Sequence, residues 1–226
     1  MTFSITGRCA RTGQLGVAIT TSSIAVGSRC PWVRAGVGAV ATQNVTLPSI
    51  GNDVLDIIAK GHTAQSALDT VMASERHPEY RQVAVVDHAG RTALFSGANT
   101  LGTHATSIGT DCIAAGNLLK SAALPEIMTD TFAANAGLHL ADRLLTALRA
   151  GQIDGGGEEG PVHSACLLVA DIHPWPLVDL RVDWHEADPI AELGHLWAAF
   201  EPQMPDYVSR AVDPAAAPSY GVPGDE

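Results

Sequence analysis

Residues 2–20 read TFSITGRCARTGQLGVAIT, and this stretch predicts a β-hairpin. In its first part Phe3 and Ile5 alternate with polar residues, which is typical of a strand with one buried face. Turn-forming residues at 11–14 separate it from a second, more apolar run at 15–20. A chain that opens with two antiparallel strands does not follow the strictly alternating strand–helix order of a doubly wound parallel sheet.

The remaining chain continues as groups of strands separated by helices. We expect further strands at 34–43, 81–87, 92–97, 112–115, 164–171 and 177–183. We expect helices at 51–60, 64–75, 124–135, 138–149 and 189–200, with a helical turn near Tyr207. Residues 28–32 should form a loop, and the glycine-rich run 152–160 a solvated linker.

Pairing of the N-terminal strands with the C-terminal strands would close one domain over residues 1–226, with a Pro-rich tail at 213–226. Two antiparallel sheets stacked face to face, with helices outside, satisfy this order. The sequence therefore predicts an α+β protein, a four-layer αββα sandwich.

Composition excludes several classes of protein. Of the 226 residues 46% are hydrophobic and 16% charged, so the chain can bury a core and is not disordered. The net charge of −11 disfavours nucleic acid as a partner. The sequence has neither an 18-residue apolar run nor a secretory signal, and its four cysteines form no CxxC pair. We expect a cytoplasmic protein with reduced thiols and no membrane partner.

Thr2 is the first candidate for catalysis. If Met1 is removed, Thr2 carries a hydroxyl nucleophile and, as base, an α-amine of ordinary pKa about 7.7–8.0. The hairpin brings Thr21, Ser22 and Ser23 close to Thr2, where Ser22 can assist catalysis and Thr21 and Ser23 can bind substrate. The alternative is that Thr2 is only a terminal residue and that these hydroxyls satisfy loop backbone groups.

Other candidates lie at strand ends. Arg34 can hold a substrate carboxylate or lower the pKa of a nearby amine, although a structural ion pair is the alternative. Gln43 and Asn117 are candidate donors to a transition-state oxyanion, with a turn as the alternative for Asn117 because it follows Gly116. Asn44 and Arg81 are candidates for substrate binding.

The sequence has no motif that binds a metal or a cofactor, and the alternative is a surface divalent site where His185 and Glu186 adjoin Asp183 and Asp188. It contains no HxH or HExxH motif, no phosphate-binding P-loop and no GxGxxG. We therefore predict a site without metal or cofactor that acts on a small-molecule substrate.

Several strings together resemble one bacterial family. They are TFSI, GQLGVAI, AVGSRCPWVRAGVGAVATQN, YRQVAVVD, AAGNLL, DLRVDW and APSYGVPGD. The family is the domain of unknown function 1028, placed in the N-terminal nucleophile (Ntn) hydrolase superfamily. The resemblance implies the αββα fold and hydrolysis of amide bonds by the terminal Thr2. In proteasome-like members of the superfamily a lysine on strand three supports the nucleophile. This chain has Arg34 near that position, and its only lysines are Lys60 and Lys120.

These observations predict an Ntn-type amidohydrolase that cleaves a C–N bond of a small amide or carbamoyl compound. One alternative is a non-catalytic binding or assembly protein on the same sandwich, because a fold does not determine function. Another is a hydrolase that depends on a metal or on a cysteine such as Cys30. Exposed strand edges and the Trp175–Pro176 loop suggest association of copies into a homo-oligomer.

Overall fold

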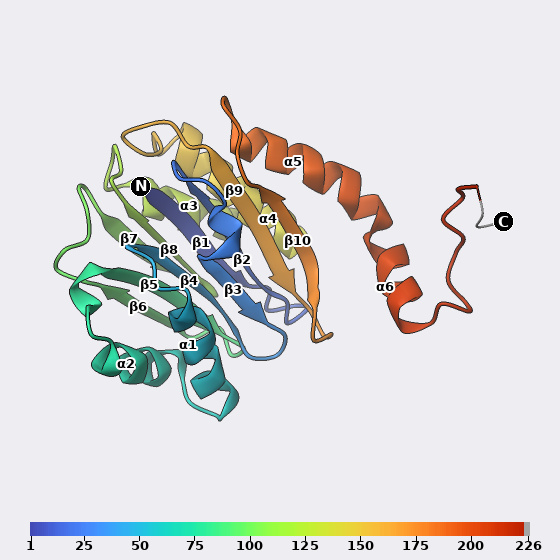
Figure 1. Ribbon diagram of the computed structural model, residues 1–226, viewed down its shortest axis with the longest axis horizontal. Helices are drawn as coiled ribbons and strands as arrows, with labels where there is room; N and C mark the ends of the chain where they lie inside the picture. The colour runs from blue at the N-terminus through green and yellow to red at the C-terminus, as the bar shows by residue number, and fades with distance from the viewer. Residues whose placement is uncertain (224–226) are drawn as a thin grey trace.

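Two stacked antiparallel sheets form the centre of the computed structural model, which describes residues 1–223 (Figure 1). The larger sheet has the strand order β10-β9-β2-β1-β8-β7. Its strands are β1 (Thr2–Arg8), β2 (Leu15–Thr21), β7 (Ala105–Gly109), β8 (Cys112–Asn117), β9 (Ser164–Ala170) and β10 (Pro176–Val182). The smaller sheet has the order β3-β4-β5-β6, formed by β3 (Pro31–Arg34), β4 (Gly38–Asn44), β5 (Arg81–Asp87) and β6 (Thr92–Ser96).

Helices cover the outer face of each sheet. The smaller sheet is covered by α1 (Ser49–Ala59) and α2 (Ala64–Ser74), and the larger by α3 (Leu124–Ala134), α4 (Leu140–Ile153) and α5 (Pro189–Phe200). Short 3-10 turns lie at Val26–Ser28, Pro78–Tyr80 and Glu201–Gln203. Helix α6 (Met204–Val212) and the chain after it extend away from the sandwich (Figure 1). The chain is thus an α+β, four-layer αββα sandwich, as the strand order predicts.

The alternation in the first strand places its side chains in two different layers. Phe3 and Ile5 are fully buried against α3 and α4, whereas Ser4 and Thr6 face the other sheet. The layer between the sheets is otherwise lined by small and branched aliphatic residues. Ser4 finds its partner in Gln43 of the other sheet, whereas the Thr6 hydroxyl is buried without a hydrogen-bond partner among the described residues.

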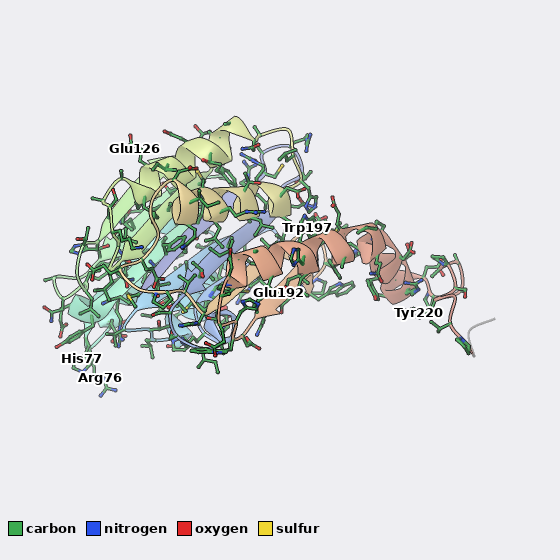
Figure 2. All side chains as sticks on the ribbon, turned by 90° about the horizontal axis from the view of Figure 1, so that it is seen from above. Arg76, His77, Glu126, Glu192, Trp197 and Tyr220 are labelled. Carbon is green, nitrogen blue, oxygen red and sulfur yellow. The ribbon has the colours of Figure 1, made fainter. Side chains whose placement is uncertain are left out.

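Helix α5 is attached to the sandwich through a buried tryptophan. Trp197, labelled in Figure 2, is 3% exposed, and its indole N–H donates to Asp142 on α4 at 2.7 Å. Its ring stacks on His139 with centroids 5.4 Å apart. This anchor fixes α5 beside α4 over the larger sheet. Within residues 1–223, no helix combines the length and the apolar character that crossing a bilayer requires.

Two strand predictions were wrong in detail. The single strand expected at 34–43 is two strands, β3 and β4, joined by a turn at which Gly36 has a φ of +66°. Pro31, expected in a loop, opens β3 at the edge of the smaller sheet, where a missing N–H costs no ladder bond. Strand β7, which was not expected, pairs with β8 at the other sheet's edge.

The linker prediction was also wrong. The backbone N–H of Lys120 donates to the carbonyl of Gly157 at 3.1 Å, and that of Glu159 to the carbonyl of Leu118 at 2.9 Å. The segment 157–159 is therefore paired with the chain that leaves β8. The Pro-rich tail expected at 213–226 follows α6, and its residues 224–226 lie outside the described residues.

Candidate active site

Three neighbouring strands bring Thr2, Thr21 and Asn117 side by side. Thr2 opens β1, and it pairs directly with Thr21 at the end of β2 and with Asn117 at the end of β8. Directly paired residues of neighbouring strands point to the same face of a sheet. Here the face is the one turned toward the smaller sheet, and the side chains are buried, Thr2 being 6% exposed. The hairpin prediction that Thr21 lies beside Thr2 is therefore confirmed.

The Thr2 hydroxyl is in contact with a peptide carbonyl. Its Oγ1 donates to the carbonyl oxygen of Met1 at 2.5 Å and lies 3.1 Å from Oγ1 of Thr21. The hydroxyl of Thr21 donates to the same Met1 oxygen. Two hydroxyls thus converge on one carbonyl oxygen. As long as Met1 is attached, the Thr2 nitrogen belongs to a peptide bond and cannot accept a proton.

Side-chain amides link the two sheets next to Thr2. Nδ2 of Asn117 and Nε2 of Gln43 donate to Oε1 of Gln82 at 3.1 and 2.8 Å. Oε1 of Gln43 accepts from the Ser4 hydroxyl at 2.7 Å, and Nε2 of Gln82 donates to the Gly116 carbonyl at 3.2 Å. These bonds hold Asn117 in one orientation. Its Oδ1 is buried and has no hydrogen-bond partner among the described residues.

A buried carboxylate completes the cluster. Glu158 is 1% exposed, and neither of its oxygens has a hydrogen-bond partner in the described part of the chain. Burial raises the pKa of Glu158 to about 8, although the positive α-amino group of Met1 and the backbone N–H of Ser22 partly offset the effect. Glu158 therefore lies where Met1, the end of β2 and the segment after β8 meet.

Family comparison places the chain in a family of unknown function. The family model described as "Family of unknown function (DUF1028)" matches residues 2–193. The chain belongs to the DUF1028 family. A search of curated proteins finds no match.

Two solved structures are similar to this DUF1028 chain. Protein SPO2555 from Silicibacter pomeroyi, also of the DUF1028 family, is 30% identical with a TM-score of 0.83, covering 91% of this chain and 89% of its own. Anbu (ancestral beta-subunit) from Yersinia bercovieri is 8% identical with a TM-score of 0.42, covering 89% of this chain and 96% of its own.

In this DUF1028 chain Arg34 lies away from the cluster around Thr2. It pairs with Gly38 at the start of β4. Gln43 lies five residues further along β4, which at the rise of a β-strand places it about 16 Å from Gly38. Its guanidinium donates to Asp56 of α1 at 2.7 Å, and both side chains are substantially exposed. The turn after β3 puts Arg34 at the opposite end of the sheet, so the structure does not bring it together with Thr2.

Asn44 and Arg81 lie next to the amide cluster but serve the backbone around it. Asn44 donates to the carbonyl of Tyr80 at 2.7 Å and accepts from the N–H of Leu101 at 3.2 Å. Arg81 donates to Glu75 at 3.0 Å and to the carbonyl of Val45 at 2.7 Å. These bonds tie both side chains to the surrounding chain, and the Nε of Arg81 is buried without a hydrogen-bond partner among the described residues.

Ser22 and Ser23 continue the chain beyond Thr21. Ser22 is half-buried, and its backbone N–H is the group near Glu158. Ser23 is exposed, and its hydroxyl accepts from Arg29 at 2.6 Å. The Ser23 hydroxyl also lies 3.3 Å from Oγ1 of Thr21, so both serines border the site.

The alternative nucleophile Cys30 is buried at 2% exposure. Burial raises the pKa of its thiol above the ordinary value, against the opposing effect of a contact with the Thr46 hydroxyl at 3.6 Å. A thiol of this kind is a poor nucleophile at neutral pH, because the thiolate is the reactive form. Across residues 1–223, His, Cys, Asp and Glu side chains nowhere gather in threes as a metal site would need.

Sequence reasoning missed Glu158 and Gln82. Gln82 is signalled by its position, since it shares the inward-facing side of β5 with the apolar residues Ala84 and Val86. Glu158 has a weaker signal in the glycines before it. Gly156 and Gly157 have φ values of +79° and +68°, which only glycine adopts easily, and they turn the chain back toward β8. A glycine run that builds a defined turn resembles a flexible linker in sequence.

Proposed function

We propose that the chain, once Met1 has been removed, hydrolyses a C–N bond of a small amide or carbamoyl compound with Thr2 as the nucleophile. The observation that carries this proposal is the buried Thr2 hydroxyl, placed between the sheets and in contact with a carbonyl oxygen that Thr21 also binds. Removal of Met1 frees the α-amine of Thr2 and the space that the Met1 carbonyl occupies.

The reaction follows from these positions. Oγ1 of Thr2 attacks the substrate carbonyl carbon, and its proton passes to the α-amine, which is the base closest to it. The Thr21 hydroxyl, which already donates to a carbonyl oxygen, stabilises the oxyanion together with the Nδ2 group of Asn117. The α-ammonium then gives its proton to the leaving nitrogen as the C–N bond breaks. Water then attacks the resulting ester and gives a proton to the amine, which passes it to Oγ1 of Thr2 as the ester C–O bond breaks, and Thr2 is restored.

The amides of Gln43 and Gln82 act through Asn117 and do not touch the substrate in this proposal. Gln82 holds Nδ2 of Asn117 at 3.1 Å, and Gln43 shares the same acceptor oxygen. Such fixed dipoles stabilise developing charge without reorganising during the reaction. They are therefore positioning residues.

The test is a panel of small amides and carbamoyl compounds assayed with the wild type, Thr2→Ala and Thr2→Ser. We expect Thr2→Ala to lose activity by roughly a thousandfold and Thr2→Ser to keep part of it, because serine retains the hydroxyl. An amide-directed electrophile should modify residue 2 of the wild type, as read by peptide mass spectrometry. Hydrolysis by Thr2→Ala at the wild-type rate would refute the proposal.

The enzyme requires removal of Met1, whereas the non-catalytic alternative does not. With Met1 attached, the Thr2 nitrogen is acylated and its hydroxyl is bound to the Met1 carbonyl, so the site cannot react. Intact mass of the purified chain distinguishes the two: retained Met1 favours a binding or assembly protein, and its loss favours the enzyme. The association of copies stays a prediction, which the molar mass in solution tests against 23.5 kDa for one chain.

A further inference from the structure

A cavity of about 390 Å³ lies at the other end of β1 from Thr2. Its wall includes Cys9, which follows β1 seven residues beyond Thr2, roughly 23 Å away at the rise of a β-strand. The turn after β1, the turn between β7 and β8, and the connection from α3 to α4 meet around it. Its volume is in the range of small-molecule sites.

A buried cation lines this cavity. Arg143 of α4 is 6% exposed, and its Nε and Nη2 donate to the carbonyl of Phe132 at 3.3 and 3.1 Å. The guanidinium also lies over the ring of Phe132, 3.8 Å from its centroid. Neither partner carries a negative charge. Within residues 1–223, no carboxylate forms an ion pair with Arg143.

The missing counter-ion has an energetic consequence. A buried charge is costly unless an opposite charge pairs with it. Burial holds the pKa of Arg143 below its ordinary value, which shows that its surroundings do not fully compensate the positive charge. An anion that reaches this guanidinium from the cavity would supply the compensation.

The other charged groups of the wall leave the cavity positive. Asp111 lines it, but Nη1 of Arg8 lies 2.8 Å from Oδ1 of Asp111, so this carboxylate is already paired. Arg11 is exposed at the mouth, and its Nη2 donates to two carbonyls of the α3–α4 connection at 3.3 and 3.4 Å. Two guanidiniums therefore border the cavity without a carboxylate of their own, although the whole chain carries a net charge of −11.

The rest of the wall is mainly apolar. Ala10, Ala133 and Ala136 line the cavity at its exposed side, and the Cys9 thiol, 2% exposed, lines it at the buried side. The alanine methyl groups offer a surface for an apolar body whose charged end reaches Arg143. Cys9 provides a chemical reporter, because an anion held beside it covers the thiol and disfavours its thiolate form.

We propose that this cavity is a binding site for a small organic oxyanion. Its carboxylate or phosphate group is held by Arg143, with Arg11 at the mouth, and its apolar body lies against Ala133 and Ala136. A guanidinium binds both head groups, because its parallel N–H donors match two of their oxygens. The site is separate from Thr2 and does not rest on the proposed function.

The experiment combines calorimetric titration of the wild type with iodoacetamide labelling of Cys9 at pH 7.5, read by peptide mass spectrometry. The probes are benzoate, phenyl phosphate and benzamide, which has the ring of benzoate without its charge. We expect at least one anion to bind and to slow the labelling of Cys9 severalfold at saturation, and benzamide to leave the rate unchanged. The anion that binds more tightly identifies the head group. No protection by either anion, or equal protection by benzamide, would overturn the proposal.

Two arginine variants on the same helix test the residue that holds the anion. Arg143→Gln removes the buried charge, whereas Arg149→Gln removes an exposed one from α4. We expect Arg143→Gln to weaken binding of the anion by roughly tenfold or more, because charge-assisted hydrogen bonds are lost, and Arg149→Gln to bind like the wild type. Circular dichroism verifies that both fold. Unchanged affinity in folded Arg143→Gln would refute the assignment, and if this variant does not fold, the comparison of the anions with benzamide in the wild type decides.

Discussion

The side chain of Asn117 on the larger sheet donates to Oε1 of Gln82 on the smaller sheet at 3.1 Å. The same oxygen accepts from Gln43 at 2.8 Å, so one amide oxygen serves two buried donors. All three side chains are 1% exposed or less. The bond joins the two sheets at the end of the sandwich where Thr2 lies, and it fixes the residue that pairs with Thr2.

Removal of the shared acceptor should destabilise the fold. In Gln82→Leu the donors on Asn117 and Gln43 lose their acceptor in a layer that water does not reach. We expect the free energy of unfolding to fall by roughly 3 kcal/mol, since each unsatisfied buried donor costs about 1–3 kcal/mol. Urea unfolding followed by circular dichroism measures the change. The matched control is Gln65→Leu on the exposed side of α2, where a change below about 0.5 kcal/mol is expected.

The protonation of Glu158 should make stability depend on pH. Burial raises its pKa from the ordinary 4.5 to about 8 in the folded chain, so between these values the folded state holds a proton that the unfolded state has lost. Stability therefore falls as pH rises through this window, by at most about 1.4 kcal/mol per pH unit. The groups facing Glu158 are the N-terminal ammonium and the Ser22 N–H, and Lys120 on the paired segment is exposed.

Thermal or urea unfolding from pH 5 to pH 8 tests this dependence. Glu158→Gln should flatten the profile and be more stable than the wild type at pH 8, whereas Glu159→Gln should follow the wild type. A Glu158→Gln profile with the wild-type slope would show that another group titrates.

Blocking the N-terminus should abolish the proposed activity without unfolding the chain. A tag fused ahead of Met1 keeps the Thr2 nitrogen in a peptide bond, so it cannot take the proton of the attacking hydroxyl. We expect no amide hydrolysis from this form and full activity from one tagged after residue 226. Circular dichroism should be the same for both. Activity of the N-terminally tagged form would show that the α-amine is not the base.

The four cysteines should differ strongly in reactivity. Burial alone would raise the pKa of Cys9, but hydrogen bonds from Thr12 and the charge of Arg143 outweigh it and hold the pKa below its usual value. Cys9 also lines a cavity of about 390 Å³. Burial instead raises the pKa of Cys112 to about 11 and that of Cys166 further.

Iodoacetamide at pH 7.5, followed by peptide mass spectrometry, should therefore label Cys9 first, because the thiolate is the reactive form. Cys9→Ser should remove the fast phase of labelling and leave the rest unchanged. Fast labelling of Cys166 would contradict the order.

The order of strands and helices is enough to predict the sandwich. The period of two in the first strand predicts which of its residues face the helices and which face the other sheet. The hairpin also predicts that Thr21 lies beside Thr2. The turn at Gly36 was hidden because Ala35, Gly36 and Val37 continue a run of small residues that reads as strand. The burial of Glu158 could not be predicted from the sequence, because it depends on a pairing with Leu119 in the segment after β8 that the residues around Glu158 do not indicate.

The structure places Arg34 at a different end of the sheet from the one expected from the sequence. The two positions predict different effects of substituting this residue. The Arg34–Asp56 pair is largely exposed, with side-chain exposures of 37% and 58%, so water and salt screen it. We expect Arg34→Gln to change kcat/KM for a confirmed substrate by less than twofold and the free energy of unfolding by less than about 1 kcal/mol. Asp56→Asn should have the same small effect on stability, because it removes the other partner of the same pair. Steady-state kinetics and urea unfolding of both variants provide the measurement, and a tenfold rise in KM for Arg34→Gln would return this arginine to the site.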